Sequence, residues 1–341
     1  MNTYTISGNA FTGDDFEFEN VEIVVENGII KEICPKNKKS DRWIFPAFFN
    51  AHTHVADTVA MDTKVDRPLA ELVSPPDGIK HKILNSTSDD VLARAISETL
   101  LFMKNTGTLG FADFREGGVN GAELLKKIVP KDMTSMIFGR DGGEFVSDGL
   151  GMSNAKGRAG EEKIVEEARK AGKFFAVHAG EADTKDIDTA LSLEPDLIIH
   201  ATNFSKKQIH EAADKNIPIV LCPRSNWILG VTNSAEKPPV KEMLEAGCTL
   251  YLGTDNVMFV EPNMFKECAF LHTVYRVDVN QVMNMATQGF SLAGIKNTIV
   301  EGNKANLTVL ECPYENHWSR YPLQSVFMRS GKIRGTYSCL E

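Results

Sequence analysis

Residues 45–54 read FPAFFNAHTH, an apolar run that ends in two histidines, His52 and His54. Side chains of a strand alternate between its two faces, so this spacing points both imidazoles in one direction at one strand end. Neutral imidazole is the commonest metal ligand in proteins, and a buried strand would hold the pair rigidly. The stretch therefore predicts a strand that supplies half of a transition-metal site, although histidines so spaced also occur in cores and on surfaces.

The composition of the chain is that of a folded, average globular protein. Its 341 residues suffice for one large α/β domain with a small accessory layer, or for two ordinary domains. The formal net charge of −9 argues against a partner that is nucleic acid or a membrane surface, because either would need clustered Lys and Arg. We therefore expect a small-molecule partner.

No targeting or disulfide signal stands out in the sequence. The first residues lack a basic start and an apolar signal core, and no apolar run approaches the length that spans a bilayer. The six cysteines show no paired C-x-x-C spacing, which argues against a disulfide framework and a thiolate zinc site. We expect a cytoplasmic protein with reduced thiols.

Both ends of the chain resemble short β-strands in their polar and apolar alternation. Asn27-Gly28 separates two β-prone runs, residues 16–25 and 29–33, and Asn-Gly is the strongest short-range hairpin signal. Near the other end we expect strands over 306–310, 325–329 and 333–337, the last two joined by a turn at 330–332. We therefore predict a small β-sandwich domain built from residues 1–44 plus 300–341.

Residues 45–299 alternate apolar strands with helical stretches, a pattern typical of parallel β/α architecture. After the first strand, residues 66–78 are rich in Pro and Gly and predict an irregular loop that covers the site. Further strands are expected at 108–114, 134–139, 144–147, 174–178, 197–200, 217–222 and 249–253. With the first strand these make eight, which predicts a (β/α)8 TIM barrel whose chemistry collects at the carboxyl ends of its strands.

Ionisable side chains recur at those strand ends. A fully apolar run ends at His178, with Glu181 three residues later, and other runs end at His200 and Asp255. A single buried histidine is more often an ordinary hydrogen-bonded core residue. Four strands with such endings together predict a site.

These motifs resemble the amidohydrolase superfamily of metal-dependent hydrolases, most closely its branch of adenosine, cytosine, guanine and S-adenosylhomocysteine deaminases. The resemblance covers nearly the whole chain and rests on five segments: Pro46 with Asn50-Ala51-His52-Thr53-His54-Val55, His178-Ala179-Gly180-Glu181, His200, Cys222-Pro223-Arg224-Ser225-Asn226, and Leu252-Gly253-Thr254-Asp255-Asn256. The tail through Asn306 also looks like that family's closing segment, with Asn306 where an Asp is usual.

The resemblance implies a role for each residue at the strand ends. His52, His54, His178 and Asp255 would bind one divalent metal, with His200 beside it and Glu181 as the proton shuttle. Three imidazoles and a carboxylate with one open position suit a catalytic zinc site, with iron or manganese as alternatives, and such a metal brings the pKa of water to roughly 7. His200 and Asp255 would orient the water or accept its proton, while Glu181 protonates a ring nitrogen.

One metal is expected rather than two. Superfamily members with two metals commonly carry a carboxylated lysine at the fourth strand, and residues 144–153 contain no lysine.

Substrate contacts are predicted from loops near the strand ends, namely Arg115, Arg140, Arg224, Asn226 and His81. For the arginines and Asn226, an equally good interpretation is that they pair with neighbouring side chains or backbone. The lysines that flank His81 favour a solvated loop for that residue.

The predicted activity is hydrolytic deamination of a purine-, pyrimidine- or pterin-like heterocycle by metal-activated water. One alternative is hydrolysis of a cyclic amide C–N bond, for which a positioned acid such as Glu181 is less needed. A second is a binding protein that keeps the fold without turnover, which would require missing ligands. A homo-oligomer is compatible with the sequence.

Overall fold

The structure, a computed structural model, describes residues 3–38, 40–329 and 332–338. In its larger sheet every neighbouring pair of strands is parallel, and the order is β12-β11-β10-β9-β8-β7-β6-β5-β13. The strands are β5 (Phe48–His54), β6 (Thr108–Arg115), β7 (Thr134–Gly139), β8 (Gly149–Met152), β9 (Phe174–Ala179), β10 (Leu197–His200), β11 (Ile219–Leu221), β12 (Leu250–Leu252) and β13 (Asp255–Asn256).

The two ends of this sheet are neighbours along the chain, because only Gly253 and Thr254 separate β12 from β13. β12 pairs with β11 and β13 pairs with β5, so the sheet curls round to meet itself. The contact is tight at Gly253, where a Cβ atom would lie 2.6 Å from the backbone nitrogen of His52. Taken as one strand, β12 and β13 complete eight positions, which fits the predicted (β/α)8 barrel.

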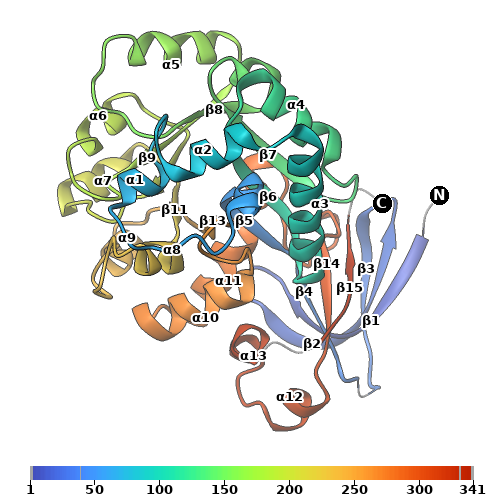
Figure 1. The fold of residues 1–341 in the computed structure, drawn as a ribbon. Coiled ribbons are helices and arrows are strands. Elements are labelled where there is room, and N and C mark those ends of the chain that lie inside the picture. The colour runs from blue at the N-terminus through green and yellow to red at the C-terminus, as the bar shows by residue number, and fades with distance from the viewer. Residues whose placement is uncertain (1–2, 39, 330–331, 339–341) are drawn as a thin grey trace.

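Helices surround the barrel (Figure 1). They are α3 (Asp89–Asn105), α4 (Gly118–Ile128), α5 (Glu161–Lys170), α6 (Ile187–Ser192), α7 (Lys206–Asp214), α8 (Pro223–Ile228), α9 (Val240–Glu245), α10 (Met264–Tyr275) and α11 (Val279–Thr287), with short 3-10 helices η1 (Val55–Ala60), η2 (Gly143–Val146) and η3 (Gln288–Ala293). Inside the barrel, Phe49, Phe114, Phe138 and Phe290 are buried and fill one apolar cluster. This packing fixes the strand ends that carry the polar residues.

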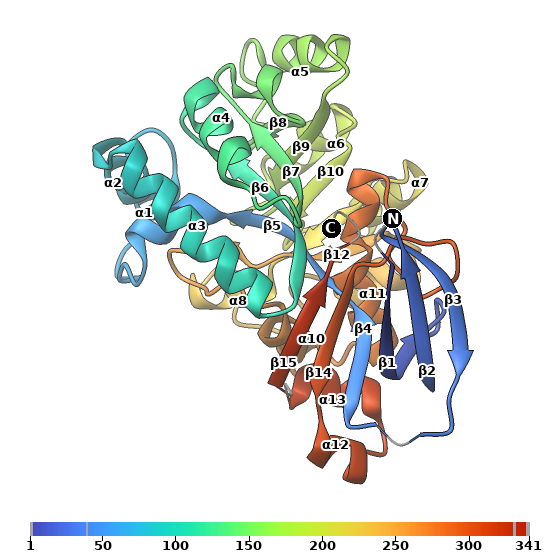
Figure 2. The ribbon, with the colours of Figure 1, turned by 90° about the vertical axis from the view of Figure 1, so that its right-hand side faces the viewer.

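Both ends of the chain contribute to a second sheet with the order β15-β14-β4-β1-β2-β3 (Figure 2). Its strands are β1 (Thr3–Thr12), β2 (Glu17–Glu26), β3 (Ile29–Pro35), β4 (Arg42–Pro46), β14 (Leu307–Glu311) and β15 (Lys332–Tyr337). The predicted hairpin joins β2 to β3, with Asn27 and Gly28 both at positive φ, as a type I′ turn requires. A two-layered sandwich, and the division into domains at residues 44 and 300, remain predictions.

Two predicted strands are wrong. The strand predicted at residues 144–147 does not form, because residues 143–146 form η2. The strand that follows η2 is β8, whose sequence GLGM carries little β propensity. Both glycines of β8 lie where a Cβ would meet a neighbouring carbonyl oxygen, at 2.6 Å for Gly149 and 2.9 Å for Gly151.

The second wrong strand is the run 325–329, which lies mostly in α13 (Pro322–Met328), the helix that follows α12 (Pro313–Trp318). Pro322 opens α13 at a position where a missing N–H costs nothing. Of the turn predicted after that run, residues 330 and 331 lie outside the described residues.

The segment predicted as an irregular loop over the site contains one complete short helix and runs into a second. α1 (Leu69–Val73) and α2 (Ile79–Ser86) flank Pro75 and Pro76. Figure 2 shows this segment on the opposite side of the barrel from the terminal sheet. Among the described residues, no helix is long and apolar enough to cross a membrane.

Candidate metal centre

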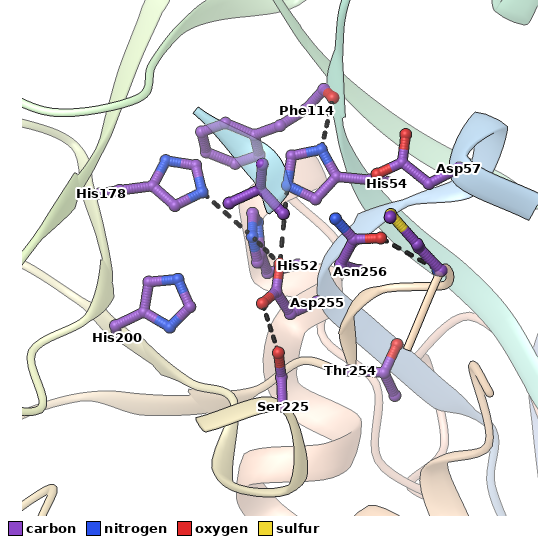
Figure 3. Close-up of polar contacts among 12 residues, drawn as sticks. His52, His54, Asp57, Phe114, His178, His200, Ser225, Thr254, Asp255 and Asn256 are labelled. Atoms are coloured by element: carbon purple, nitrogen blue, oxygen red, sulfur yellow. Dashed lines mark hydrogen bonds and ion pairs between the residues drawn. The ribbon is translucent and has the colours of Figure 1, made fainter. Parts of the chain in front are cut away.

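Four histidines and one aspartate meet at the carboxyl ends of four strands (Figure 3). His52 and His54 end β5, and the others are His178 of β9, His200 of β10 and Asp255 of β13. All five residues are buried, with no more than 8% of their surface exposed. His200 and Asp255 hold left-handed backbone conformations, with φ of 76° and 61°. Such conformations are costly for non-glycine residues and concentrate at functional sites.

The ring nitrogens converge on one carboxylate oxygen. Nε2 of His52 lies 3.2 Å from Oδ1 of Asp255, and Nε2 of His54 lies 3.6 Å from the same atom. Nε2 of His178 lies 3.2 Å from Nε2 of His52. Ser225 donates a hydrogen bond to the other oxygen, Oδ2 of Asp255, at 2.6 Å, which leaves Oδ1 turned to the histidines.

The outer nitrogens determine where the ring hydrogens lie. Nδ1 of His54 is 3.0 Å from the carbonyl oxygen of Phe114, and Nδ1 of His178 is 2.9 Å from that of Met152. A carbonyl oxygen only accepts, so each Nδ1 carries the hydrogen and each Nε2 presents a lone pair to the centre. Nδ1 of His52 is buried and has no hydrogen-bond partner among the described residues. Imidazoles that ligate metals are commonly oriented by such outer hydrogen bonds.

His52 and His178 are neutral and Asp255 is ionised, so all three offer electron pairs to a cation. Burial lowers the pKa of His52 to about 3 and holds the pKa of His178 well below its usual range, so both rings are neutral. Burial alone would raise the pKa of Asp255, but the neighbouring imidazoles, first through the hydrogen bond with His52, outweigh it and keep that pKa low. Imidazoles and a carboxylate that converge in this way fit a divalent cation, and two three-residue groups here have ligand atoms close enough to share one: His52, His54 and Asp255, and His52, His178 and His200.

Glu181 and His200 lie on the open side of this centre. Oε1 of Glu181 is 3.7 Å from Nε2 of His200, and the two also form a potential ligand group with Asp255. Burial raises the pKa of Glu181, and the nearby Asp255 raises it further, while His200 opposes the shift. Glu181 therefore keeps a proton at higher pH than an exposed glutamate would.

A cavity of about 310 Å³ opens onto this centre. Glu181, His200 and Asp255 line it, together with His81, Arg140 and residues of α1. The volume lies at the small end of the range for small-molecule pockets.

The five predicted substrate contacts fall into different environments. His81 and Arg140 line the cavity, whereas Arg115 lines a neighbouring one and donates from Nε to the carbonyl oxygen of Glu116. Arg224 lies outside the cavity wall, because its Nε donates to Glu267 at 2.6 Å and its Nη2 to the carbonyl of Glu261. Asn226 also lies behind the wall, where its Oδ1 accepts from Nδ1 of His200 at 3.1 Å.

A buried ion cluster behind His54 was not predicted. Lys80 of α2 has only 3% of its surface exposed, and its Nζ lies 2.8 Å from Asp57 and 2.7 Å from Glu116, whose Oε1 is in turn 3.3 Å from Nδ1 of His54. In the sequence Lys80 is one of two lysines beside His81, and nothing there distinguishes it from a solvated side chain. Its contacts join α2 to η1 and to the end of β6.

Replacing Lys80 with methionine should destabilise the protein by about 3–5 kcal/mol, because Asp57 and Glu116 would lose a buried counter-charge. Urea unfolding measures the loss. Lys82→Met, on the same helix but exposed, is the matched control and should change stability by less than about 0.5 kcal/mol. Adding Asp57→Asn to Lys80→Met should recover part of the loss, and a Lys80→Met protein as stable as Lys82→Met would contradict the cluster's role.

Known proteins resemble this chain in sequence and in fold. The sequence model of the family "Adenosine deaminase" matches residues 137–301. A putative aminohydrolase of Methanothermobacter thermautotrophicus is 32% identical, over 89% of this chain and 90% of that protein. Among solved structures, a zinc-bound adenosine deaminase from Xanthomonas campestris superposes with a TM-score of 0.79 at 14% identity, covering 99% of this chain and 92% of that one. A triazine hydrolase from Arthrobacter aurescens superposes with a TM-score of 0.82 at 14% identity, covering 100% and 94%.

Proposed function

This chain belongs to the amidohydrolase superfamily and is a hydrolase of non-peptide carbon–nitrogen bonds, and from this premise we propose that it is a metal-dependent deaminase. Its substrate would be a purine-, pyrimidine- or pterin-like heterocycle that carries an exocyclic amino group. The observation that supports the proposal most strongly is Glu181, an acid of raised pKa placed 3.7 Å from His200 beside the predicted ligands. The adenosine deaminase family match and the zinc-bound deaminase neighbour point the same way.

His52, His54, His178 and Asp255 would hold one divalent metal, for which zinc suits the ligand types best. When bound there, the metal supplies a Lewis acid that brings the pKa of water to about 7. The carbonyl oxygens of Phe114 and Met152 fix the orientation of His54 and His178. Ser225 fixes the orientation of Asp255 in the same way.

Proton movement is assigned to three side chains. Asn226 accepts from Nδ1 of His200, so Nε2 of His200 is free to take a proton from water. Asp255 Oδ1 offers a second acceptor in the same place. Glu181 gives its carboxyl proton to a ring nitrogen of the substrate as the water oxygen adds to the amino-bearing carbon. The proton collected from water then goes to the amino group, which leaves as ammonia, while the remaining hydroxyl proton returns to Glu181 and the ring keeps an oxo group.

Removing the side chain that orients His200 should slow this reaction. Asn226→Ala is expected to lower turnover by about 10–100-fold while metal content stays unchanged, as loss of an outer hydrogen bond does at metal centres. Steady-state rates with elemental analysis measure both quantities. Thr202→Val, which removes only the other partner of Asn226, is the control and should cost less. Equal losses in the two variants would show that packing, rather than the orientation of His200, is responsible.

Ammonia release from a panel of aminated heterocycles, run beside a panel of cyclic amides, tests the proposal. Deamination predicts ammonia in equal amount to the hydroxylated or oxo product from at least one aminated ring. Ring opening of a cyclic amide without ammonia would favour the alternative hydrolase. No turnover of either panel by metal-loaded protein would favour a binding function on the same fold. We also propose that the protein is cytoplasmic, that it forms a homo-oligomer and that its terminal domain has two layers.

A further inference from the structure

The buried ion cluster touches one of the metal-binding histidines, although it takes no part in the proton movements of the proposed mechanism. Oε1 of Glu116 lies 3.3 Å from Nδ1 of His54, and both side chains are buried. The hydrogen on that nitrogen therefore has two acceptors, the carboxylate of Glu116 and the carbonyl oxygen of Phe114 at 3.0 Å. Glu116 thus reaches the ring from the side opposite Nε2, the nitrogen that is turned to the centre.

The three imidazoles that would hold the metal differ in what lies at their outer nitrogens. Nδ1 of His178 donates to the carbonyl oxygen of Met152, and Nδ1 of His52 has no hydrogen-bond partner among the described residues. Within the part of the chain that the structure describes, His54 alone of the three has a carboxylate at its outer nitrogen. A carbonyl oxygen orients a ring, whereas a carboxylate also places a full negative charge beside it.

Three cations hold the carboxylate of Glu116 in this position. Its Oε1 also lies 2.7 Å from Nζ of Lys80 and 3.6 Å from Nη2 of Arg140, and its Oε2 lies 3.3 Å from Nη2 of Arg115. Nε of Arg115 donates to the backbone carbonyl of Glu116, which fixes the main chain at the same residue. Turning the carboxylate away from His54 would break buried ion pairs, which are costly to lose.

A carboxylate in this cluster could serve the fold alone, as a partner for Lys80. Asp57 does so, since it is fully buried and its Oδ2 lies 2.8 Å from Nζ of that lysine. No hydrogen bond or ion pair joins Asp57 to His54 among the described residues. The two carboxylates share one lysine, and of the two only Glu116 also meets a histidine of the centre.

A carboxylate at the outer nitrogen of an imidazole changes the inner nitrogen as well. It draws the ring hydrogen toward itself, which leaves the inner nitrogen richer in electrons and a stronger ligand. It also resists rotation of the ring. Removing an outer contact of this kind commonly costs about 10–100-fold in metal affinity.

We propose that Glu116 is a positioning residue, whose carboxylate orients His54 and strengthens it as a metal ligand. The inference rests on the proposed metal-dependent function and adds to it a residue that itself holds neither metal nor substrate. Its test measures metal binding rather than turnover, so a wrong choice of reaction would not affect the result.

The zinc affinity of the metal-free protein, measured by competition with a chelator, tests the proposal. Glu116→Gln keeps the size of the side chain but removes its charge, and should weaken zinc binding about 10–100-fold. Glu116→Asp keeps the charge near Lys80 but draws the oxygen back by one methylene, and should weaken zinc binding about tenfold or more. Asp57→Asn is the matched control, because it removes an equal charge from the same lysine without a contact to His54, and should leave zinc affinity unchanged.

Cobalt in place of zinc provides a second readout, because its visible absorption depends on the strength and arrangement of its ligands. The bands of cobalt-loaded Glu116→Gln should be shifted from those of the wild-type protein, whereas the bands of Asp57→Asn should coincide with them. Loss of a purely structural residue would lower the thermal unfolding temperature and leave the bands in place.

Equal zinc affinity in the wild-type protein and folded Glu116→Gln would overturn the inference. An equal loss of affinity in Asp57→Asn would assign the effect to the charge of the cluster rather than to the contact with His54, and would overturn it as well. Should Glu116→Gln fail to fold without metal, Glu116→Asp decides, and wild-type affinity in that variant would contradict the proposal. A wild-type protein that binds no zinc would refute the proposed metal-dependent function too, whereas the other outcomes leave that function standing.

Discussion

Glu181→Gln will keep its metal and lose about 10²–10⁴-fold in turnover, because it removes the one proton that a general acid supplies. Glutamine has nearly the same shape, so the cavity and the five residues of the centre are left in place. Oε1 of Glu181 lies 3.7 Å from Nε2 of His200, and among the described residues no hydrogen bond ties the Glu181 carboxylate to the fold. The loss should therefore appear in kcat more than in metal content or stability.

Steady-state kinetics and elemental analysis of the same preparation separate the two effects. Glu162→Gln, an exposed residue of α5, is the matched control and should behave as the wild-type protein does. A Glu181→Gln protein with bound metal and full activity would remove Glu181 from the mechanism.

His52→Ala should abolish metal binding under conditions that saturate the wild-type protein. His52 is fully buried, and its Nε2 lies 3.2 Å from Nε2 of His178 and 3.2 Å from Oδ1 of Asp255. Loss of an outer-shell contact already costs about 10–100-fold in affinity, so loss of a central ligand should weaken metal binding by more than about 100-fold. Turnover should fall with the metal content.

His210→Ala gives the matched control, since His210 is exposed on α7 and belongs to none of the possible ligand groups. Elemental analysis after dialysis measures metal in both variants. A His52→Ala protein that retains one equivalent would refute the ligand assignment, whatever its activity.

The barrel was predictable because most of its strands are uniformly apolar runs that end in a polar residue. β9 carries His178 as its last residue but one and β10 ends at His200, and both histidines lie at the centre. β8 could not be predicted, because its sequence is set by close backbone approaches at Gly149 and Gly151 rather than by a hydrophobic pattern. The helix α2 was missed for a related reason, since Lys80, which anchors it, makes its contacts with residues distant in sequence.

The residues that meet at the centre were all named from the sequence, whereas the positions of the supporting residues were not. Asn226 was predicted to contact substrate but lies behind His200, and Arg224 pairs with Glu267 of α10. Both orientations depend on which way the chain turns after β11, which strand patterns do not specify. Substrate contacts by His81, Arg115 and Arg140 remain predictions.

Titration of metal-free protein with zinc, with ammonia release measured at each addition, tests the central claim most directly. A single hydrolytic centre made by His52, His54, His178 and Asp255 predicts that activity rises linearly and stops rising at one equivalent of zinc. Ammonia release by protein that contains no metal, or a break only at two equivalents, would contradict it.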